Sequence, residues 1–273
     1  MESFQQFLSE WEDLLKASPV NSIYLSPQWQ QVWWDYYGLD RELAGFYIDE
    51  SGLLMAVASL SKQGDEVTFT GGPETARHII KNSAENLSQV SLELGGKSPV
   101  AVFEDADQEN ALNGITAGIF GASGQSCIAG SRLYLQKNIY NNFLDKLVDR
   151  ANKIKLGDPM DPKTQMGPLS SLKQLEIIEK NIKDTMNQGG KLKCGGKRHS
   201  LSNKGYYFPA TIIECENHNL PTAENELFGP ILSVMKFETE EEVINKMNDN
   251  QYGLSSGVYT RDLGRGLRVS KAI

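Results

Sequence analysis

The sequence has no long hydrophobic run. The longest apolar stretch, residues 53–60, spans eight residues and includes Ser59, whereas a helix needs ~20 apolar residues to cross a bilayer. The N-terminus, Met-Glu-Ser-Phe-Gln-Gln, also lacks the basic and then apolar order of a signal peptide. The sequence therefore predicts no transmembrane helix, no membrane partner and a cytoplasmic location.

Cysteine and basic residues are both scarce. The three cysteines, Cys127, Cys194 and Cys215, are odd in number and show no Cys-x-x-Cys spacing, so neither a disulfide framework nor a zinc site is supported. Lys and Arg number 27 against 35 Asp and Glu, a net charge of −8, which repels a phosphate backbone. A nucleic-acid partner is thus disfavoured.

What the sequence does contain is typical of a globular protein. Its 273 residues are 40% hydrophobic and 23% charged, which is enough to bury a substantial core without disulfides or metal. We therefore expect one large α/β domain or two ordinary domains.

The composition changes near residue 63. All four tryptophans lie within the first 34 residues, and 11 of the 24 aromatic residues precede residue 63. Helical spacing predicts amphipathic helices over residues 4–15 and 29–37, and two β-rich runs, 43–48 and 53–60, predict a hairpin. We place a boundary within residues 61–66 and expect the aromatic side chains before it to form a core or an interface.

Beyond residue 65, strands and helices alternate, which predicts an α/β fold. Gly71-Gly72-Pro73 separates a short strand, 67–70, from a helical face over residues 79–87. Further strands are predicted at 89–94, 99–103, 133–136, 208–213, 231–237 and 254–260. Further helices are predicted at 107–120, 138–154, 170–188 and 240–248, with another starting near residue 262.

Cys127 lies in a glycine-rich loop, Gly-Ala-Ser-Gly-Gln-Ser-Cys-Ile-Ala-Gly-Ser, between a predicted helix and a strand. Small neighbours leave its thiol accessible, and nearby backbone N–H groups can lower the pKa of a thiol and bind an oxyanion. These features suit a nucleophile. Taken alone, the loop fits a buried packing cysteine better than a nucleophile.

Five motifs in order resemble the aldehyde dehydrogenase superfamily: FTGGPETARHI, SLELGGKSP, GQSCIAGSR, ENELFGP and NDNQYGLSSGVYT. The resemblance covers about residues 66–273. It implies an incomplete aldehyde dehydrogenase-like α/β fold, with a remnant of a dinucleotide-binding domain at 64–96 and a catalytic domain at 97–273. Residues 1–63 form an α+β segment that weakly resembles the start of a GNAT-like acyltransferase.

The resemblance implies that Cys127 attacks an aldehyde and forms a thiohemiacetal and then a thioester. Glu93, 34 residues earlier, matches the general base that activates water. This chemistry needs a soft nucleophile and a carboxylate whose pKa is raised by burial, so we expect Glu93 close to Cys127. The alternative for Glu93 is an ion pair at the strand end with a lysine such as Lys97.

The resemblance also implies NAD or NADP as cofactor. Glu226 matches the residue that binds the nicotinamide ribose hydroxyls, and Phe228 matches the one beside the nicotinamide. Gly71 and Gly72 match the glycine turn next to the pyrophosphate, where a helix N-terminus approaches a phosphate. Ala76 replaces a usual glycine and Gly72 a frequent serine, so the contacts to the pyrophosphate should be weaker or should come from the backbone only.

Several parts of the family pattern have no counterpart in the sequence. They include the first dinucleotide-binding strands, a Pro-Trp-Asn motif, a Lys-Pro motif and the closing strands that pair subunits, so a homo-oligomer is only one possibility. Two hypotheses stay open. One is NAD(P)-dependent oxidation of an aldehyde; the other is a truncated, catalytically impaired chimera with residual esterase activity, in which Cys127 still reacts faster than the other thiols.

Overall fold

The computed structural model describes residues 66–199 and 205–273, and the strand backbones at 42–43, 46–48, 54–57 and 61–63. The chain divides into two compact units, Met1–Leu94 and Gly95–Ile273, which are described separately. The helices predicted over residues 4–15 and 29–37 lie outside the described residues.

Unit 1 contains a four-stranded sheet in the order β1-β4-β5-β6, with β1 at Glu42–Leu43, β4 at Ser61–Gln63, β5 at Glu66–Gly71 and β6 at Gln89–Leu94. β5 and β6 are parallel and are joined by helix α4, Pro73–Ser83, whereas β1, β4 and β5 pair antiparallel. The parallel strand-helix-strand unit therefore begins only at β5. The boundary predicted within residues 61–66 falls where β4 and β5 pair antiparallel, so one sheet includes strands from both sides of it.

The other described strands of unit 1 confirm the predicted hairpin. β2 (Phe46–Ile48) and β3 (Leu54–Val57) pair antiparallel, with a register shift between Tyr47 and Ile48. Helix α4 also begins as predicted, because Gly72 is its N-cap and Pro73 occupies its first turn.

Unit 2 is built on a six-stranded sheet in the order β12-β7-β8-β11-β10-β9. All neighbouring strands are parallel except β9, which pairs antiparallel with β10 at one edge. The strands are β7 Pro99–Val102, β8 Arg132–Gln136, β9 Lys191–Cys194, β10 Thr211–Glu214, β11 Ile231–Phe237 and β12 Gly257–Tyr259. The predicted strands are confirmed with shifts of a few residues at their ends, and β9 was not predicted.

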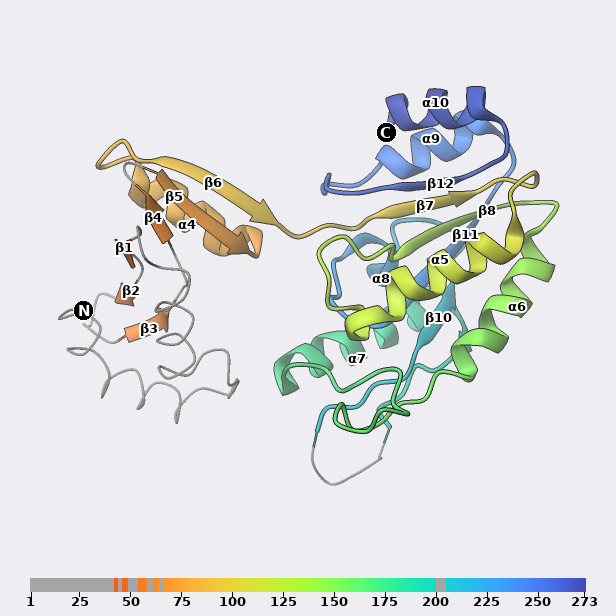
Figure 1. Cartoon of the computed structure of the whole chain (residues 1–273), viewed down its shortest axis with the longest axis horizontal. Coiled ribbons are helices and arrows are strands. Elements are labelled where there is room, and N and C mark those ends of the chain that lie inside the picture. Colours follow the sequence, from red (N-terminus) through yellow and green to blue (C-terminus); the bar gives the residue numbers. More distant parts are fainter. Residues whose placement is uncertain (1–41, 44–45, 49–53, 58–60, 64–65, 200–204) are drawn as a thin grey trace. The chain divides into compact units, whose positions relative to one another are not determined.

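Helices cover both faces of this sheet, which gives three layers (Figure 1). One face packs against α5 and α6, and the other against α7, α8, α9 and α10. The helices are α5 Gln108–Phe120, α6 Tyr140–Asn152, α7 Leu172–Asn187, α8 Pro221–Glu224, α9 Glu240–Asn248 and α10 Leu263–Ala272. The predicted long helices are confirmed.

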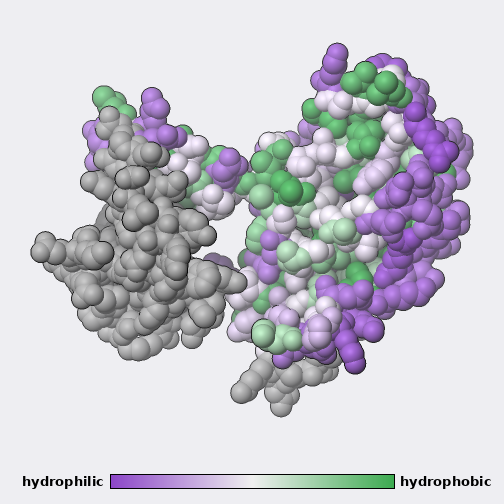
Figure 2. Space-filling model, viewed as in Figure 1, coloured by the Kyte–Doolittle hydropathy of each residue, from purple (hydrophilic) through white to green (hydrophobic). Residues whose placement is uncertain are grey.

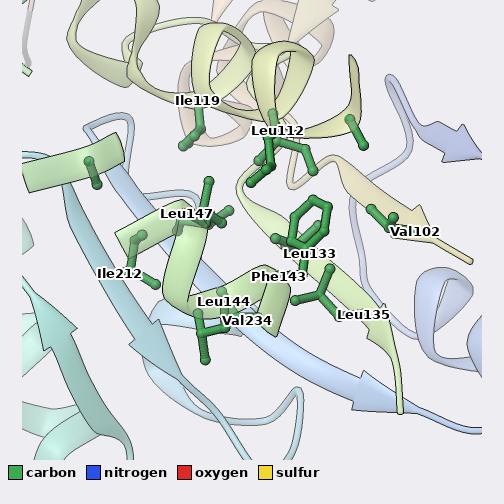
Figure 3. Packing of buried hydrophobic residues seen from close by; sticks show 14 of the residues in the cluster. Val102, Leu112, Ile119, Leu133, Leu135, Phe143, Leu144, Leu147, Ile212 and Val234 are labelled. Atoms are coloured by element: carbon green, nitrogen blue, oxygen red, sulfur yellow. The ribbon is translucent and has the colours of Figure 1, made fainter. Parts of the chain in front are cut away.

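The core follows from the two-residue repeat of the strands. In β8, Leu133 and Leu135 point toward α5 and α6, while Tyr134 packs on the opposite face. Figure 3 shows the first cluster, in which Leu112 and Phe143 lie over these strand leucines. Both sheet faces are buried, so the strands carry continuous apolar runs, as parallel strands do.

Local capping explains where the helices start. Asp107, Ser171, Thr239 and Asp262 each accept a hydrogen bond from a backbone N–H in the first turn of the following helix. Such caps satisfy donors that have no partner inside the helix.

A buried arginine ties three elements of unit 2 together. Arg132, at the start of β8, donates from Nε to the carbonyl of Lys97 at 2.7 Å and from its terminal nitrogens to the carbonyls of Lys246 and Met247 in α9. It also donates to the Tyr134 hydroxyl at 3.1 Å. Because Lys97 lies two residues before β7, this network positions the residues that lead into the sheet.

A carboxylate anchors α10 in a similar way. Asp105 accepts hydrogen bonds from the Thr260 hydroxyl at 2.8 Å, from the backbone N–H groups of Arg261 and Asp262, and from the Arg265 guanidinium at 2.9 Å. These bonds hold the loop after β12 and the first turn of α10.

Hydrophilic side chains gather along one border of unit 2 in Figure 2, and hydrophobic ones gather near α10. On α10, Leu263 and Leu267 are exposed. Across the described residues, no helix combines the length and hydropathy needed to span a membrane. In the same part of the chain, no group of three His, Cys, Asp or Glu side chains is arranged to hold a metal ion.

Candidate active site

The loop that carries Cys127 connects α5 to β8. It opens with a 3-10 turn, Gly121–Gly124, in which Ala122, Ser123 and Gly124 adopt φ values of 49°, 56° and 69°. Left-handed backbone at two non-glycine residues is uncommon and requires support from the surroundings. The loop then passes through a turn closed by the Ala129 N–H on the Ser126 carbonyl, and Cys127 is exposed within it.

Side-chain hydrogen bonds fix this loop against the segment before α7. Gln125 donates from Nε2 to the Ser170 hydroxyl and accepts from the Ser170 backbone N–H, both at 3.0 Å. The Ser123 hydroxyl donates to the Gly167 carbonyl at 3.0 Å. Gln125, two residues before Cys127, therefore holds the loop against the segment before α7.

A pair of glycines joins the Cys127 loop to Glu226. A Cβ atom on Gly96 would lie 2.6 Å from the backbone carbonyl oxygen of Cys127, and one on Gly95 would overlap the Glu226 carboxylate. The Gly96 N–H donates to Glu226 Oε1 at 3.1 Å. Only glycine permits these two approaches, so the Leu-Gly-Gly-Lys motif brings the sequence-predicted residues Cys127 and Glu226 to one turn.

Glu226 begins a rigid loop. The carboxylate is half-buried; burial raises its pKa, while the Gly96 N–H and the nearby Lys97 ammonium oppose that rise. Phe228 is 39% exposed at a left-handed φ of 43°, and Gln174 Nε2 donates to the Leu227 carbonyl. The ring predicted to lie beside a nicotinamide is thus held out of the core.

Lys97 differs most from its expected surroundings. Its side chain is only 2% exposed, and its Nζ has no hydrogen-bond partner within the described residues. Burial, and secondarily the charge of Arg132, lower its pKa from 10.5 to about 7. A lysine between two strands is usually a solvated ammonium, and no local pattern in the sequence indicates that Lys97 is buried.

Glu93, Gly71 and Gly72 belong to unit 1, so the predicted proximity of Glu93 to Cys127 stays a prediction. Glu93 was expected to be buried, and that expectation is wrong for the described structure, in which Glu93 is exposed. The alternation along β6 explains this, because Val90, Leu92 and Leu94 share one face and Glu93 lies on the other.

The glycine turn before α4 has open space on one side. A Cβ atom on Gly72 would meet no atom within 4 Å, whereas one on Gly71 would lie 2.5 Å from the Phe69 ring. A side chain at position 71 would therefore displace the Phe69 ring, whereas position 72 leaves room in front of the N-terminus of α4.

The other two thiols lie in different surroundings. Cys194 and Cys215 are buried, and burial raises the pKa of both, that of Cys194 to about 11. Cys127 is the one exposed cysteine of the three. Reactivity toward solutes should therefore concentrate on Cys127.

Unit 2 thus combines a mainly parallel three-layer α/β domain with an exposed thiol on a glycine-rich loop and a half-buried carboxylate, features that fit the class of α/β enzymes with a cysteine nucleophile. The sequence model of the aldehyde dehydrogenase family matches residues 49–273. The chain belongs to this family. The match begins upstream of Glu66 and so includes residues 49–63, which the sequence analysis assigned to the acyltransferase-like segment.

Characterised relatives support the same assignment. The chain is 49% identical over 219 residues to a (Z)-2-((N-methylformamido)methylene)-5-hydroxybutyrolactone dehydrogenase of Acinetobacter baylyi, covering 80% of this chain and 44% of the relative. It is 42% identical over 206 residues to a betaine aldehyde dehydrogenase of Brucella ovis, covering 75% and 42%. The chain thus spans less than half the length of these relatives.

Solved structures are also similar to this chain. PnpE in complex with nicotinamide adenine dinucleotide superposes with a TM-score of 0.75 at 41% identity, covering 77% of this chain and 43% of PnpE. A betaine aldehyde dehydrogenase variant from Staphylococcus aureus in complex with NAD+ gives 0.74 at 40% identity, covering 77% and 43%. The similarity therefore includes the fold as well as the sequence.

Proposed function

We propose that this chain contributes the nucleophile and the nicotinamide-ribose anchor of an aldehyde dehydrogenase that oxidises a small aldehyde to a carboxylic acid with NAD or NADP. The observation that carries the proposal is the glycine pair, because Gly96 abuts the backbone of Cys127 while its N–H binds Glu226. One turn thus couples a nucleophile to a carboxylate suited to ribose hydroxyls.

Cys127 acts first. Its thiolate attacks the aldehyde carbonyl carbon, an S–C bond forms, and the π electron pair of the carbonyl moves to the oxygen. Within the described residues, no group accepts a hydrogen bond from the Cys127 backbone N–H, so this N–H is available to that oxyanion. When bound, the nicotinamide supplies the acceptor for the hydride that the former carbonyl carbon loses.

The resulting thioester on Cys127 is then hydrolysed. Glu93, as predicted from the sequence, takes a proton from water while the water oxygen attacks the thioester carbon. The C–S bond breaks and the electron pair returns to sulfur, which releases the carboxylic acid and regenerates the thiolate.

Three features support the nucleotide site. The Glu226 carboxylate, oriented by Gly96, accepts hydrogen bonds from ribose hydroxyls, and the exposed Phe228 ring offers an apolar surface for the nicotinamide. In unit 1, the space in front of Gly72 leaves the α4 N-terminus open to the pyrophosphate. Glu74, in the first turn of α4, adds a negative charge that weakens this phosphate contact.

The comparisons do not favour the alternative of an impaired chimera. The substrate class, a small aldehyde, follows from the family. The cytoplasmic location and the homo-oligomeric state stay predictions.

The test measures formation of NADH or NADPH by the purified chain with a panel of aldehydes that includes betaine aldehyde. Cys127→Ser should abolish the signal, whereas the matched control Cys194→Ser, at a buried thiol, should retain it. Alkylated cysteines are mapped in parallel by mass spectrometry. Turnover that survives in Cys127→Ser would refute the assigned nucleophile, and no turnover by the unaltered chain with any aldehyde would refute oxidation by this chain.

A further inference from the structure

The ammonium of Lys97 is the most unusual polar group in unit 2. It is almost fully buried and has no hydrogen-bond partner within the described residues. Burying an unpaired charge is unfavourable, and native proteins rarely retain one without a role. A methionine would fill the same volume without that penalty, so the lysine calls for an explanation beyond packing.

The location of Lys97 supplies one. Lys97 directly follows Gly96, whose N–H binds Glu226, and both Lys97 and Glu226 line one small pocket with Gly124 and Phe228. Arg132 Nε donates to the Lys97 carbonyl at 2.7 Å, which fixes the backbone from which the ammonium extends. Lys97 and Glu226 are therefore linked through Gly96 and share the lining of one pocket.

The two side chains influence each other through charge. The Lys97 ammonium opposes the rise in the Glu226 pKa that burial causes, and the Glu226 carboxylate opposes the fall in the Lys97 pKa. Loss of the Lys97 charge therefore raises the pKa of Glu226, and loss of the Glu226 charge lowers the pKa of Lys97.

We propose that Lys97 is a positioning residue for the nucleotide: its buried ammonium keeps the Glu226 carboxylate ionised and oriented to accept hydrogen bonds from the nicotinamide ribose. This inference rests on the proposed function of Glu226. Lys97 does not touch the reacting atoms; it acts through Glu226.

The proposal has a pH signature. The charged or titratable groups that act on Lys97 are Arg132, the Cys215 thiol and Glu226. Arg132 stays charged, and burial raises the pKa of the Cys215 thiol, so Lys97 is the group that titrates near neutrality, at a pKa of about 7. Ribose anchoring should accordingly weaken as pH rises and Lys97 loses its proton.

The first experiment follows Glu226 directly. In protein labelled with ¹³C-glutamate, the carboxyl resonance of Glu226 is the one missing in Glu226→Gln. In the unaltered protein this resonance should show a second inflection near pH 7, where Lys97 titrates. In Lys97→Met the inflection should vanish and the Glu226 titration should move to higher pH, while the control Lys137→Met, at an exposed lysine paired with Glu238, should leave both unchanged.

The second experiment measures the NAD concentration that half-protects Cys127 from iodoacetamide at pH 6 and at pH 9. For the unaltered chain this concentration should rise about tenfold between the two pH values, the loss expected when a hydrogen bond to a charged group weakens. Lys97→Met should show the higher value at both pH values, and Lys137→Met should behave like the unaltered chain.

The outcomes separate the inference from the function on which it rests. The inference is overturned if the unaltered protein shows no inflection near pH 7, or if the Glu226 titration is unchanged in Lys97→Met. Either result holds regardless of how well NAD protects Cys127. Complete lack of protection by NAD in the unaltered chain overturns the proposed nucleotide site, and the carboxyl titration still decides whether Lys97 controls Glu226.

Discussion

Replacing Lys97 by methionine should stabilise unit 2, and by an amount that depends on pH. Burial is the main cause that lowers the Lys97 pKa from 10.5 to about 7. One pKa unit corresponds to about 1.4 kcal/mol, so the buried ammonium costs up to about 5 kcal/mol relative to a solvated one. Lys97→Met removes this cost and keeps the volume.

Proton binding in the folded and unfolded states determines how the stability gained in Lys97→Met changes with pH. Below pH 7 both the folded and the unfolded state hold the Lys97 proton, so the cost is fully present. Between pH 7 and 10.5 the unfolded state still binds a proton that the folded state has released, so the stability of the unaltered protein rises with pH. The advantage of Lys97→Met should therefore be greatest at pH 6 and shrink by about 1.4 kcal/mol per pH unit above 7.

The assay is urea unfolding at pH 6, 8 and 10, followed by circular dichroism and by pulsed alkylation of Cys194, which is buried in unit 2. Tryptophan fluorescence is unsuitable because all four tryptophans precede residue 35. A stability difference that is independent of pH would refute the assignment of a buried titrating ammonium, and a large destabilisation at pH 6 would refute the claim that the ammonium is a cost.

Three further predictions concern the thiols, the glycine pair and the anchor of α10. Iodoacetamide should modify Cys127 at least about tenfold faster than Cys194 or Cys215, because the latter two are buried with raised pKa values; equal labelling in timed peptide mapping would contradict this. Gly96→Ala should lower the free energy of unfolding by about 1–3 kcal/mol, since its Cβ would crowd the Cys127 carbonyl, and should alter the Cys127 alkylation rate; a variant unchanged in both would remove the role assigned to the close approach. Asp105→Asn should destabilise unit 2 by about 1–3 kcal/mol at pH 7. Burial raises the Asp105 pKa. Hydrogen bonds from the Thr260 hydroxyl and from the backbone N–H groups of Arg261 and Asp262, together with the Arg265 charge, lower it by more, so the net pKa lies below 3.8. The stability that Asp105 contributes is therefore present above pH 3.8 and lost as pH falls through the lower folded pKa. If the stability of Asp105→Asn fell with acid as steeply as that of the unaltered protein, this prediction would be contradicted.

Most of the fold of unit 2 could be predicted from the sequence, because its strands carry continuous apolar runs and its helices begin at capping residues such as Asp107 and Thr239. Strand β9 was missed because Lys191-Leu-Lys-Cys is short and half charged; it is a strand because it pairs with the edge of β10. At β9, pairing with β10 therefore outweighs the low strand propensity of the local sequence.

The site was predictable only in part. The resemblance of five motifs to the aldehyde dehydrogenase superfamily indicated Cys127 and Glu226, and their roles stay predictions. Nothing in Gly-Gly-Lys-Ser indicates that Lys97 is buried, because burial depends on elements that are distant in sequence. The left-handed Ala122 and Ser123 likewise carry no local signal, since this backbone is stabilised from outside the turn, by bonds such as that of Ser123 to Gly167.

The Gly95-Gly96 pair constrains how this site can change over generations. Gly95 abuts the Glu226 carboxylate, whereas Gly96 abuts the Cys127 carbonyl and binds Glu226 through its N–H, so a mutation at Gly95 disturbs the carboxylate and one at Gly96 disturbs both groups. We therefore expect both glycines to be retained, so that the spacing of the thiol and the carboxylate is inherited as one piece.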